Sequence, residues 1–70
     1  MEKVDINITT EYIKLDQLLK FSGIAESGAD AKYIIQTEKV FLNGEKVTER
    51  GRKIRSGDVV IVGEMQINVC

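Results

Sequence analysis

The sequence predicts an α+β fold in which a helix-turn-helix pair packs on a small, mostly antiparallel sheet, in the order β-α-α-β-β-β. Two observations support this prediction. Apolar residues recur at helical spacing over residues 15–35 and at strand spacing after residue 38. The pair Asn43-Gly44 then separates two short apolar runs, which is typical of a tight β-hairpin.

The N-terminal part predicts one strand and one helix. Apolar and polar residues alternate from Val4 to Thr9, as in a half-buried strand. A first helix is expected from about Leu15 to Ser22, with Asp16 in the first turn, where a carboxylate complements the partial positive charge of the helix start. Gly23 follows as a residue able to take the left-handed conformation that ends a helix.

A second helix is indicated by its capping residues. Ser27 and Asp30 stand three apart, a variant of the capping box with Asp in place of the usual Glu. Ala31, Ile34 and Ile35 follow as an apolar stripe at helical spacing. Only residues 23–26 separate the two helices, so they are expected to form a compact pair.

The rest of the chain predicts strands around a basic loop. Val40–Leu42 and Glu45–Val47 are expected to form the hairpin, and Val59–Val62 a buried strand. Residues 49–57 predict a loop with Ile54 as its apolar anchor. Residues 66–69 predict a last strand that pairs either with Val59–Val62 or with the N-terminal strand.

The aromatic residues are assigned to packing rather than to binding. Phe21 and Phe41 are expected in the core, where aromatic rings contribute most to stability. Tyr33 could meet a base beside Lys32, but a partly buried ring that covers the small core is the preferred interpretation.

Length and composition predict one small domain over residues 1–70. With 43% hydrophobic and 30% charged residues, the composition is that of a soluble globular protein. No apolar run approaches the roughly 20 residues that a membrane span needs. The N-terminus lacks the basic and apolar stretches of a signal peptide, so a cytoplasmic location is expected.

The residue types present argue against catalysis. The sequence contains no histidine, the commonest general base at neutral pH, and a single cysteine, Cys70. One cysteine allows no intramolecular disulfide, and without histidine it offers no Cys/His metal site. We therefore expect no enzyme activity, no cofactor, no metal and no small-molecule substrate.

Charge is distributed unevenly along the chain. The net charge is −1, yet residues 46–55 hold five cations and one carboxylate, a local charge of +4, so the remainder carries −5. One basic face on an otherwise acidic protein is typical of phosphate binding, and arginine suits bidentate phosphate contacts. On charge alone, a solvated loop explains the segment equally well.

An ordered set of residues extends through both helices and most strands: Lys14-Leu15-Asp16-Gln17-Leu18-Leu19, Gly23, Ser27, Ala31, Ile34-Ile35, Val40-Phe41-Leu42-Asn43-Gly44, Val47 and Gly57-Asp58-Val59-Val60. At these spacings the set resembles the S4 domain, or αL RNA-binding motif, over about residues 14–61. The pieces Ser27-Gly28-x-x-Ala31-Lys32 and Arg50-Gly51-Arg52-Lys53 are similar to those of the small stand-alone bacterial S4 proteins of the YaaA type.

The resemblance implies an RNA-binding face. In S4 domains a basic residue opens the first helix, where this chain has Lys14, and the second helix is often basic at the position of Lys32. Gly28 departs from the pattern, because many S4 domains carry an arginine there. Taken together with the basic loop, the candidate RNA-binding residues are Lys14, Lys32, Arg50, Arg52, Lys53 and Arg55.

The expected function is non-catalytic binding of structured RNA, either ribosomal or tRNA-like, with a ribosomal particle as a candidate partner. The alternative is a protein-protein adaptor that kept the fold without strong RNA binding, which the acidic pI of about 5.3 and Gly28 both permit. An enzyme or a ubiquitin-like sulfur carrier is expected least, since such a carrier needs a C-terminal Gly-Gly pair.

Overall fold

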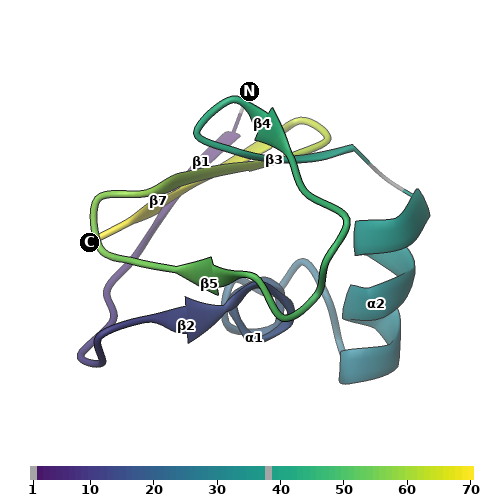
Figure 1. Cartoon of the computed structure of the whole chain (residues 1–70), viewed down its shortest axis with the longest axis horizontal. Coiled ribbons are helices and arrows are strands. Elements are labelled where there is room, and N and C mark those ends of the chain that lie inside the picture. Colours follow the sequence, from purple (N-terminus) through teal and green to yellow (C-terminus); the bar gives the residue numbers. More distant parts are fainter. Residues whose placement is uncertain (1, 38) are drawn as a thin grey trace.

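The computed structural model describes residues 2–37 and 39–70. A five-stranded sheet has the order β1-β7-β6-β3-β4, and β2 pairs with β5 in a separate two-stranded ribbon. In Figure 1 the sheet lies above α1 and the β2–β5 ribbon, with α2 at one side, so the predicted α+β class is confirmed. The elements are β1 (Glu2–Ile6), β2 (Ile13–Lys14), α1 (Leu15–Phe21), α2 (Gly28–Thr37), β3 (Val40–Leu42), β4 (Glu45–Lys46), β5 (Lys53–Ile54), β6 (Val59–Val62) and β7 (Met65–Val69).

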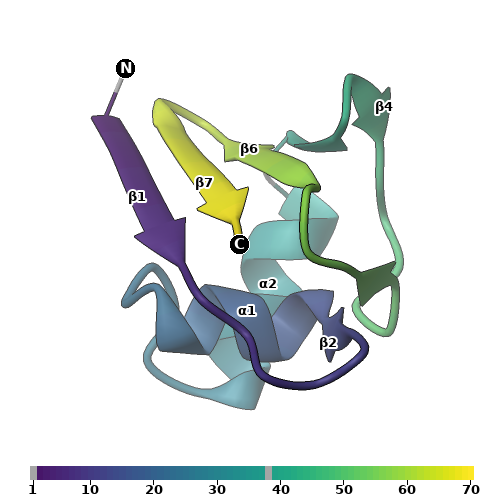
Figure 2. The ribbon, with the colours of Figure 1, turned by 90° about the vertical axis from the view of Figure 1, so that its left-hand side faces the viewer.

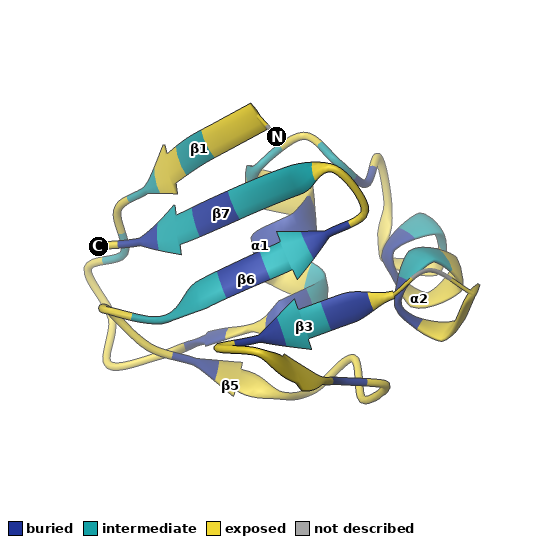
Figure 3. Ribbon diagram, turned by 90° about the horizontal axis from the view of Figure 1, so that it is seen from above, coloured by how far each residue is buried: buried dark blue, intermediate teal, exposed yellow. Residues whose placement is uncertain are grey.

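The sheet is mostly antiparallel, as predicted. Strand β6 is antiparallel to both β3 and β7, while β1 runs parallel to β7. The last strand therefore pairs with both of the partners that were proposed for it. Figure 3 shows buried positions alternating with half-buried ones along β6 and β7, because one face of the sheet covers the core.

The first strand differs from its prediction, since it spans Glu2–Ile6 rather than residues 4–9. Its register with β7 runs from Glu2 opposite Met65 to Ile6 opposite Val69. The alternation that predicted the strand continues past Ile6, and Ile8 still packs against the core, but β7 ends at Val69. Alternation shows which side chains face inward and does not show where the pairing strand ends.

Helix α1 begins and ends close to its predicted residues, and α2 begins directly after the predicted capping serine. Helix α1 buries Leu15, Leu18 and Leu19, and Ser22 is its C-cap. At the start of α2, the Ser27 hydroxyl accepts the Asp30 N–H at 3.1 Å, and the Asp30 carboxylate accepts the Glu26 N–H at 3.0 Å. The predicted capping pair is confirmed, with the carboxylate reaching one residue further back than in a standard capping box. None of the helices in the described part of the chain is long and apolar enough to cross a membrane.

The predicted hairpin is confirmed between β3 and β4. Asn43 and Gly44 have φ angles of 49° and 90°, and both must be positive in a type I′ turn. The Asn43 side chain also accepts the Val59 N–H at 2.9 Å and donates to Asp58 Oδ1 at 3.1 Å. These bonds attach the hairpin to the start of β6.

Phe21 and Phe41 were expected in the core and Tyr33 as a partly buried cover, but none of the three belongs to the core of the described residues. Phe21 is 70% exposed and Tyr33 is 66% exposed, while Phe41 is half-buried. Phe21 is the last residue of α1 and lies one turn after the exposed Gln17. Tyr33 stands midway between Ala31 and Ile35, which face the core, so its ring points away from it.

Candidate nucleic-acid interface

The β2–β5 ribbon is the centre of the candidate interface. Ile13 lies opposite Ile54 and Lys14 lies opposite Lys53. Both isoleucines are buried, Ile54 completely, whereas both lysines are exposed. The ribbon thus has one face in the core and one basic face in solvent. The predicted anchoring role of Ile54 is confirmed, but the strands themselves were not predicted, because residues 49–57 were expected to be a loop.

Main-chain hydrogen bonds attach the basic loop to the start of α1. The N–H of Leu15 donates to the carbonyl of Arg52 at 2.9 Å, and the N–H of Asp16 donates to the carbonyl of Arg50 at 3.1 Å. The first N–H groups of a helix have no partner within the helix, so the loop supplies acceptors that α1 needs. These bonds place Arg50 and Arg52 beside Lys14, which is both the end of β2 and the N-cap of α1.

The main chains of four of the six candidate residues therefore lie side by side. We call Lys14, Arg50, Arg52 and Lys53 the basic cluster. Figure 1 shows the arrangement of the backbone that carries it, with β2, β5 and the loop before β5 gathered at the start of α1. The RNA-binding role of these four residues stays a prediction.

Arg55 is held near the other end of the ribbon. It follows the buried Ile54, and its N–H donates to Asp58 Oδ2 at 2.8 Å, while the Asp58 N–H donates back to the Arg55 carbonyl at 3.0 Å. If the register of the ribbon is continued by one residue, Arg55 falls opposite Tyr12. Arg55 thus adjoins the basic cluster through the ribbon.

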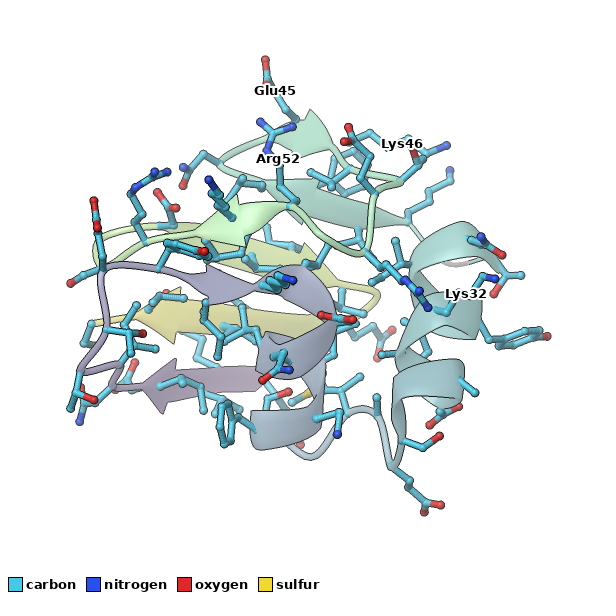
Figure 4. All side chains as sticks on the ribbon, turned by 60° about the horizontal axis from the view of Figure 1, so that its bottom comes forward. Lys32, Glu45, Lys46 and Arg52 are labelled. Atoms are coloured by element: carbon cyan, nitrogen blue, oxygen red, sulfur yellow. The ribbon has the colours of Figure 1, made fainter. Side chains whose placement is uncertain are left out.

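Lys32 stands apart from Arg52. Figure 4 shows Lys32 projecting from α2 and Arg52 projecting from the segment before β5, well separated in that view. Lys46, a member of the basic stretch 46–55, projects from β4, and in the same view the Arg52 side chain points toward Glu45 of that strand. The local charge of +4 is thus carried by β4, which holds Lys46, and by residues 50–55.

The two lysines of the ribbon face one another. Like charges directly opposite on paired strands destabilise a sheet, by an amount of the order of 0.2–1 kcal/mol. The Lys53 ammonium lies 5.0 Å from the centre of the Tyr12 ring, a cation–π contact that contributes about 0.5–1 kcal/mol at an exposed site. Packing does not require the Lys14–Lys53 pair, whereas an anion bound between the two ammonium groups would relieve their repulsion.

Gly28 leaves open space at the start of α2. A side chain added there would meet nothing within 4 Å, and the residue has no positive φ. The backbone would therefore accept the arginine that many S4 domains carry, so the fold does not require glycine at this position. Asp30 and Glu26 lie close by, which makes this end of α2 more acidic than the start of α1.

Tyr12 is a candidate that the sequence analysis missed. It is 36% exposed and in contact with Lys53. The sequence pattern that could have revealed Tyr12 is a pair of similar three-residue segments, Tyr12-Ile13-Lys14 and Lys53-Ile54-Arg55. Each has an isoleucine between two larger polar side chains. Three residues are too few for alternation to stand out, but the matching pair indicates a two-stranded ribbon.

Comparison with known proteins relates this chain to a protein family and to a bacterial protein. A model of the S4 domain matches residues 6–70, a range that contains all six candidate residues. The chain is 44% identical over 55 residues to the "Probable ribosome maturation protein RlbA" of Bacillus subtilis (strain 168), and the match covers 79% of this chain and 78% of that protein. The relative is itself short, since 55 residues make up most of it.

Proposed function

We propose, because this chain belongs to the S4 domain family, that it binds structured RNA in association with the ribosome and catalyses no reaction. The observation that carries the proposal is the basic cluster. Its four cations come from three segments, namely β2, the loop and β5, which are joined by the pairing of Lys14 with Lys53 and by two hydrogen bonds to the start of α1. Cations held on a fixed backbone are suited to phosphates at fixed spacing.

The cluster is expected to recognise the shape of an RNA rather than its sequence. Lys and Arg contacts to phosphates position a protein on a nucleic acid but carry no sequence information by themselves. Folded RNA presents phosphates in arrangements that differ between helices, bulges and loops, so a rigid set of cations can distinguish them. The buried Ile13–Ile54 pair supplies that rigidity.

We further propose that the RNA bound by this protein is ribosomal RNA. The relative in Bacillus subtilis is named as a probable ribosome maturation protein, which supports ribosomal RNA over tRNA-like hairpins as the ligand. We propose that residues 1–70 act as one RNA-binding unit in the cytoplasm, on a ribosomal particle. Lys32 would then reach a second part of the same RNA, because it stands apart from Arg52 in Figure 4.

A binding experiment with two readouts tests the proposal. The protein is incubated with purified ribosomal subunits and separated on sucrose gradients, and its affinity for isolated ribosomal RNA hairpins and for tRNA is measured at low salt. We expect co-sedimentation with ribosomal particles, and competition by the hairpins that bind best. Failure to bind any structured RNA at low salt would contradict the proposal.

Replacing Lys14 by glutamine should move binding and stability in opposite directions. Each phosphate contact contributes about 5- to 8-fold to affinity near 0.1 M salt, so RNA binding should weaken by that factor. Loss of the repulsion with Lys53 should raise the free energy of unfolding by about 0.2–1 kcal/mol. Titration with a labelled RNA hairpin and urea unfolding measure the two effects.

Lys20→Gln is the matched control for this prediction. Lys20 lies in the last turn of α1, at the opposite end of that helix from the cluster, and its loss changes the net charge by the same amount. RNA affinity should stay within about twofold of the unmodified protein, since exposed charges more than about 10 Å apart are largely screened at this salt. Equal losses in the two variants would show that overall charge, and not the cluster, governs binding.

One observation favours the alternative function of a protein-interaction adaptor. Tyr33 is 66% exposed on α2, and exposed aromatic rings are frequent at protein interfaces. An adaptor would still sediment with ribosomal particles, but it would not bind the isolated RNA. The two readouts of the binding experiment therefore separate the two functions.

A further inference from the structure

A hollow lies next to the basic cluster, between the β1–β2 connection and α1. Its volume is about 830 Å³, and its walls are the segment from Asp5 to Lys14 together with Gln17 and Phe21 of α1. Figure 2 shows the connection passing along α1 on its way from β1 to β2. Lys14, Gln17 and Phe21 follow one another at spacings of three and four, so they share one face of the helix. All three side chains are exposed.

We propose that this hollow binds an unpaired nucleobase of the RNA whose phosphates contact the basic cluster, with Tyr12 as the ring on which the base stacks. The inference rests on the proposed RNA-binding function and adds a base-binding site to it. Tyr12 and Lys14 belong both to the wall of the hollow and to the basic surface. A nucleotide whose phosphate contacts Lys14 would therefore have its base beside the hollow.

The charges of the hollow favour a base over a phosphate. Asp5 and Glu11 line it, while Lys14 is the only cation among its lining residues. A phosphate inside would meet two carboxylates, whereas a neutral base would not be repelled. Carboxylate, hydroxyl and amide groups from Asp5, Thr9 and Gln17 can accept hydrogen bonds from the amino group of a base.

The apolar part of the wall suits a flat ring. Tyr12 is 36% exposed and Phe21 is 70% exposed, and both line the hollow together with Ile6 and Ile8. Aromatic side chains that stack on unpaired bases are a recurrent means of binding single-stranded nucleotides. Lys53 lies over one face of the Tyr12 ring, and the base would stack on the other face. The exposure of Phe21, which packing does not explain, fits a second contact to the same nucleotide.

Hydrogen bonds hold this wall in place. The Thr10 hydroxyl donates to the Tyr12 carbonyl at 2.8 Å, which fixes the turn that presents the ring. Further back, the Ile8 N–H donates to the Cys70 carbonyl at 3.2 Å, and Asn68 Nδ2 donates to the Asp5 carboxylate at 3.1 Å. A binding wall that is already ordered loses less conformational entropy when the ligand arrives.

Three RNA hairpins that differ at one position test the proposal. One has a fully paired stem, one carries a single bulged 2-aminopurine, and one carries an abasic nucleotide at the same bulge. The unmodified protein should bind the bulged hairpin about 5- to 150-fold more tightly than the abasic hairpin, which is the contribution of one base stacked on an aromatic ring. The fluorescence of 2-aminopurine should fall on binding.

Variants of Tyr12 show whether the ring is responsible. Tyr12→Leu should abolish the preference for the base over the abasic site, whereas Tyr12→Phe, which keeps the ring, should retain it. Equal affinity of the unmodified protein for the two bulged hairpins would overturn the base site and leave phosphate binding intact. An equal loss on both hairpins in Tyr12→Leu would also overturn it, because the ring would then act only by positioning Lys53. If none of the hairpins binds, the proposed function fails together with this inference.

Discussion

Replacing Arg52 and Lys53 together by alanine is expected to weaken RNA binding by about 25- to 60-fold near 0.1 M salt, because two phosphate contacts are lost. Both side chains are exposed, and the main-chain bonds of the loop to α1 do not depend on them. The domain should therefore remain folded. Loss of the Lys53–Tyr12 contact and of the Lys14–Lys53 repulsion act in opposite directions on stability, so the free energy of unfolding should change by less than about 1 kcal/mol.

The matched control replaces Lys3 and Lys20 by alanine. Lys3 lies on the edge strand β1 and Lys20 near the end of α1, both outside the basic cluster, and the net charge falls from −1 to −3 in either double variant. Titration of one labelled hairpin with both proteins gives the comparison. An affinity for the Arg52→Ala, Lys53→Ala variant within twofold of its control would show that the binding surface lies elsewhere.

Replacing Ile54 by alanine is expected to lower the free energy of unfolding by about 2–5 kcal/mol. Ile54 is completely buried, and its partner Ile13 is the only other residue that anchors the β2–β5 pairing in the core. A chain of this size has a total stability of roughly 4–10 kcal/mol, so the loss is a large part of it. Urea unfolding followed by circular dichroism measures the change, since the protein has no tryptophan.

Ile34→Ala is the control for the Ile54 variant. It removes the same atoms from a half-buried position on α2, where less apolar area is lost and alanine favours the helix. Its cost should be clearly smaller than that of Ile54→Ala. If the two variants lost equal stability, or if Ile54→Ala cost less than about 1 kcal/mol, the ribbon would not be anchored as described.

The helices and the hairpin were predictable because local interactions specify them. Ser27 and Asp30 cap α2 through bonds to neighbouring N–H groups, and Asn43-Gly44 supplies the two positive φ angles of its turn. In each case the residues that carry the signal and the structure they form lie within a few positions of each other. Consistency between such local preferences and the tertiary fold is typical of natural sequences.

The β2–β5 ribbon was not predictable in the same way. Its strands have two residues each and come from distant parts of the chain, so neither shows a period of its own. Their pairing depends on the burial of Ile13 against Ile54, which is a tertiary contact. The exposure of Phe21 was not predictable from helical spacing, because Phe21 lies three residues after the buried Leu18 and could have shared its face.

The sequence indicated some residues of the candidate site and missed others, because part of the site depends on the tertiary pairing of β2 with β5. Charge along the sequence located the loop of residues 50–55, but it could not show that the Arg52 side chain points toward Glu45 of β4. Lys14 was included through the resemblance to S4 domains, and the structure gives the physical reason for its place beside the loop, which is the pair it forms with Lys53. Tyr12 was missed, since its significance comes from the ribbon.

The salt dependence of RNA binding tests the central claim most directly. If the basic cluster contacts four phosphates, a plot of the logarithm of the association constant against the logarithm of salt concentration should have a slope between about −2.8 and −3.6. The Arg52→Ala, Lys53→Ala variant should reduce the magnitude of that slope by about 1.4–1.8. A flat plot for the unmodified protein, or an unchanged slope in the variant, would contradict RNA binding through this surface.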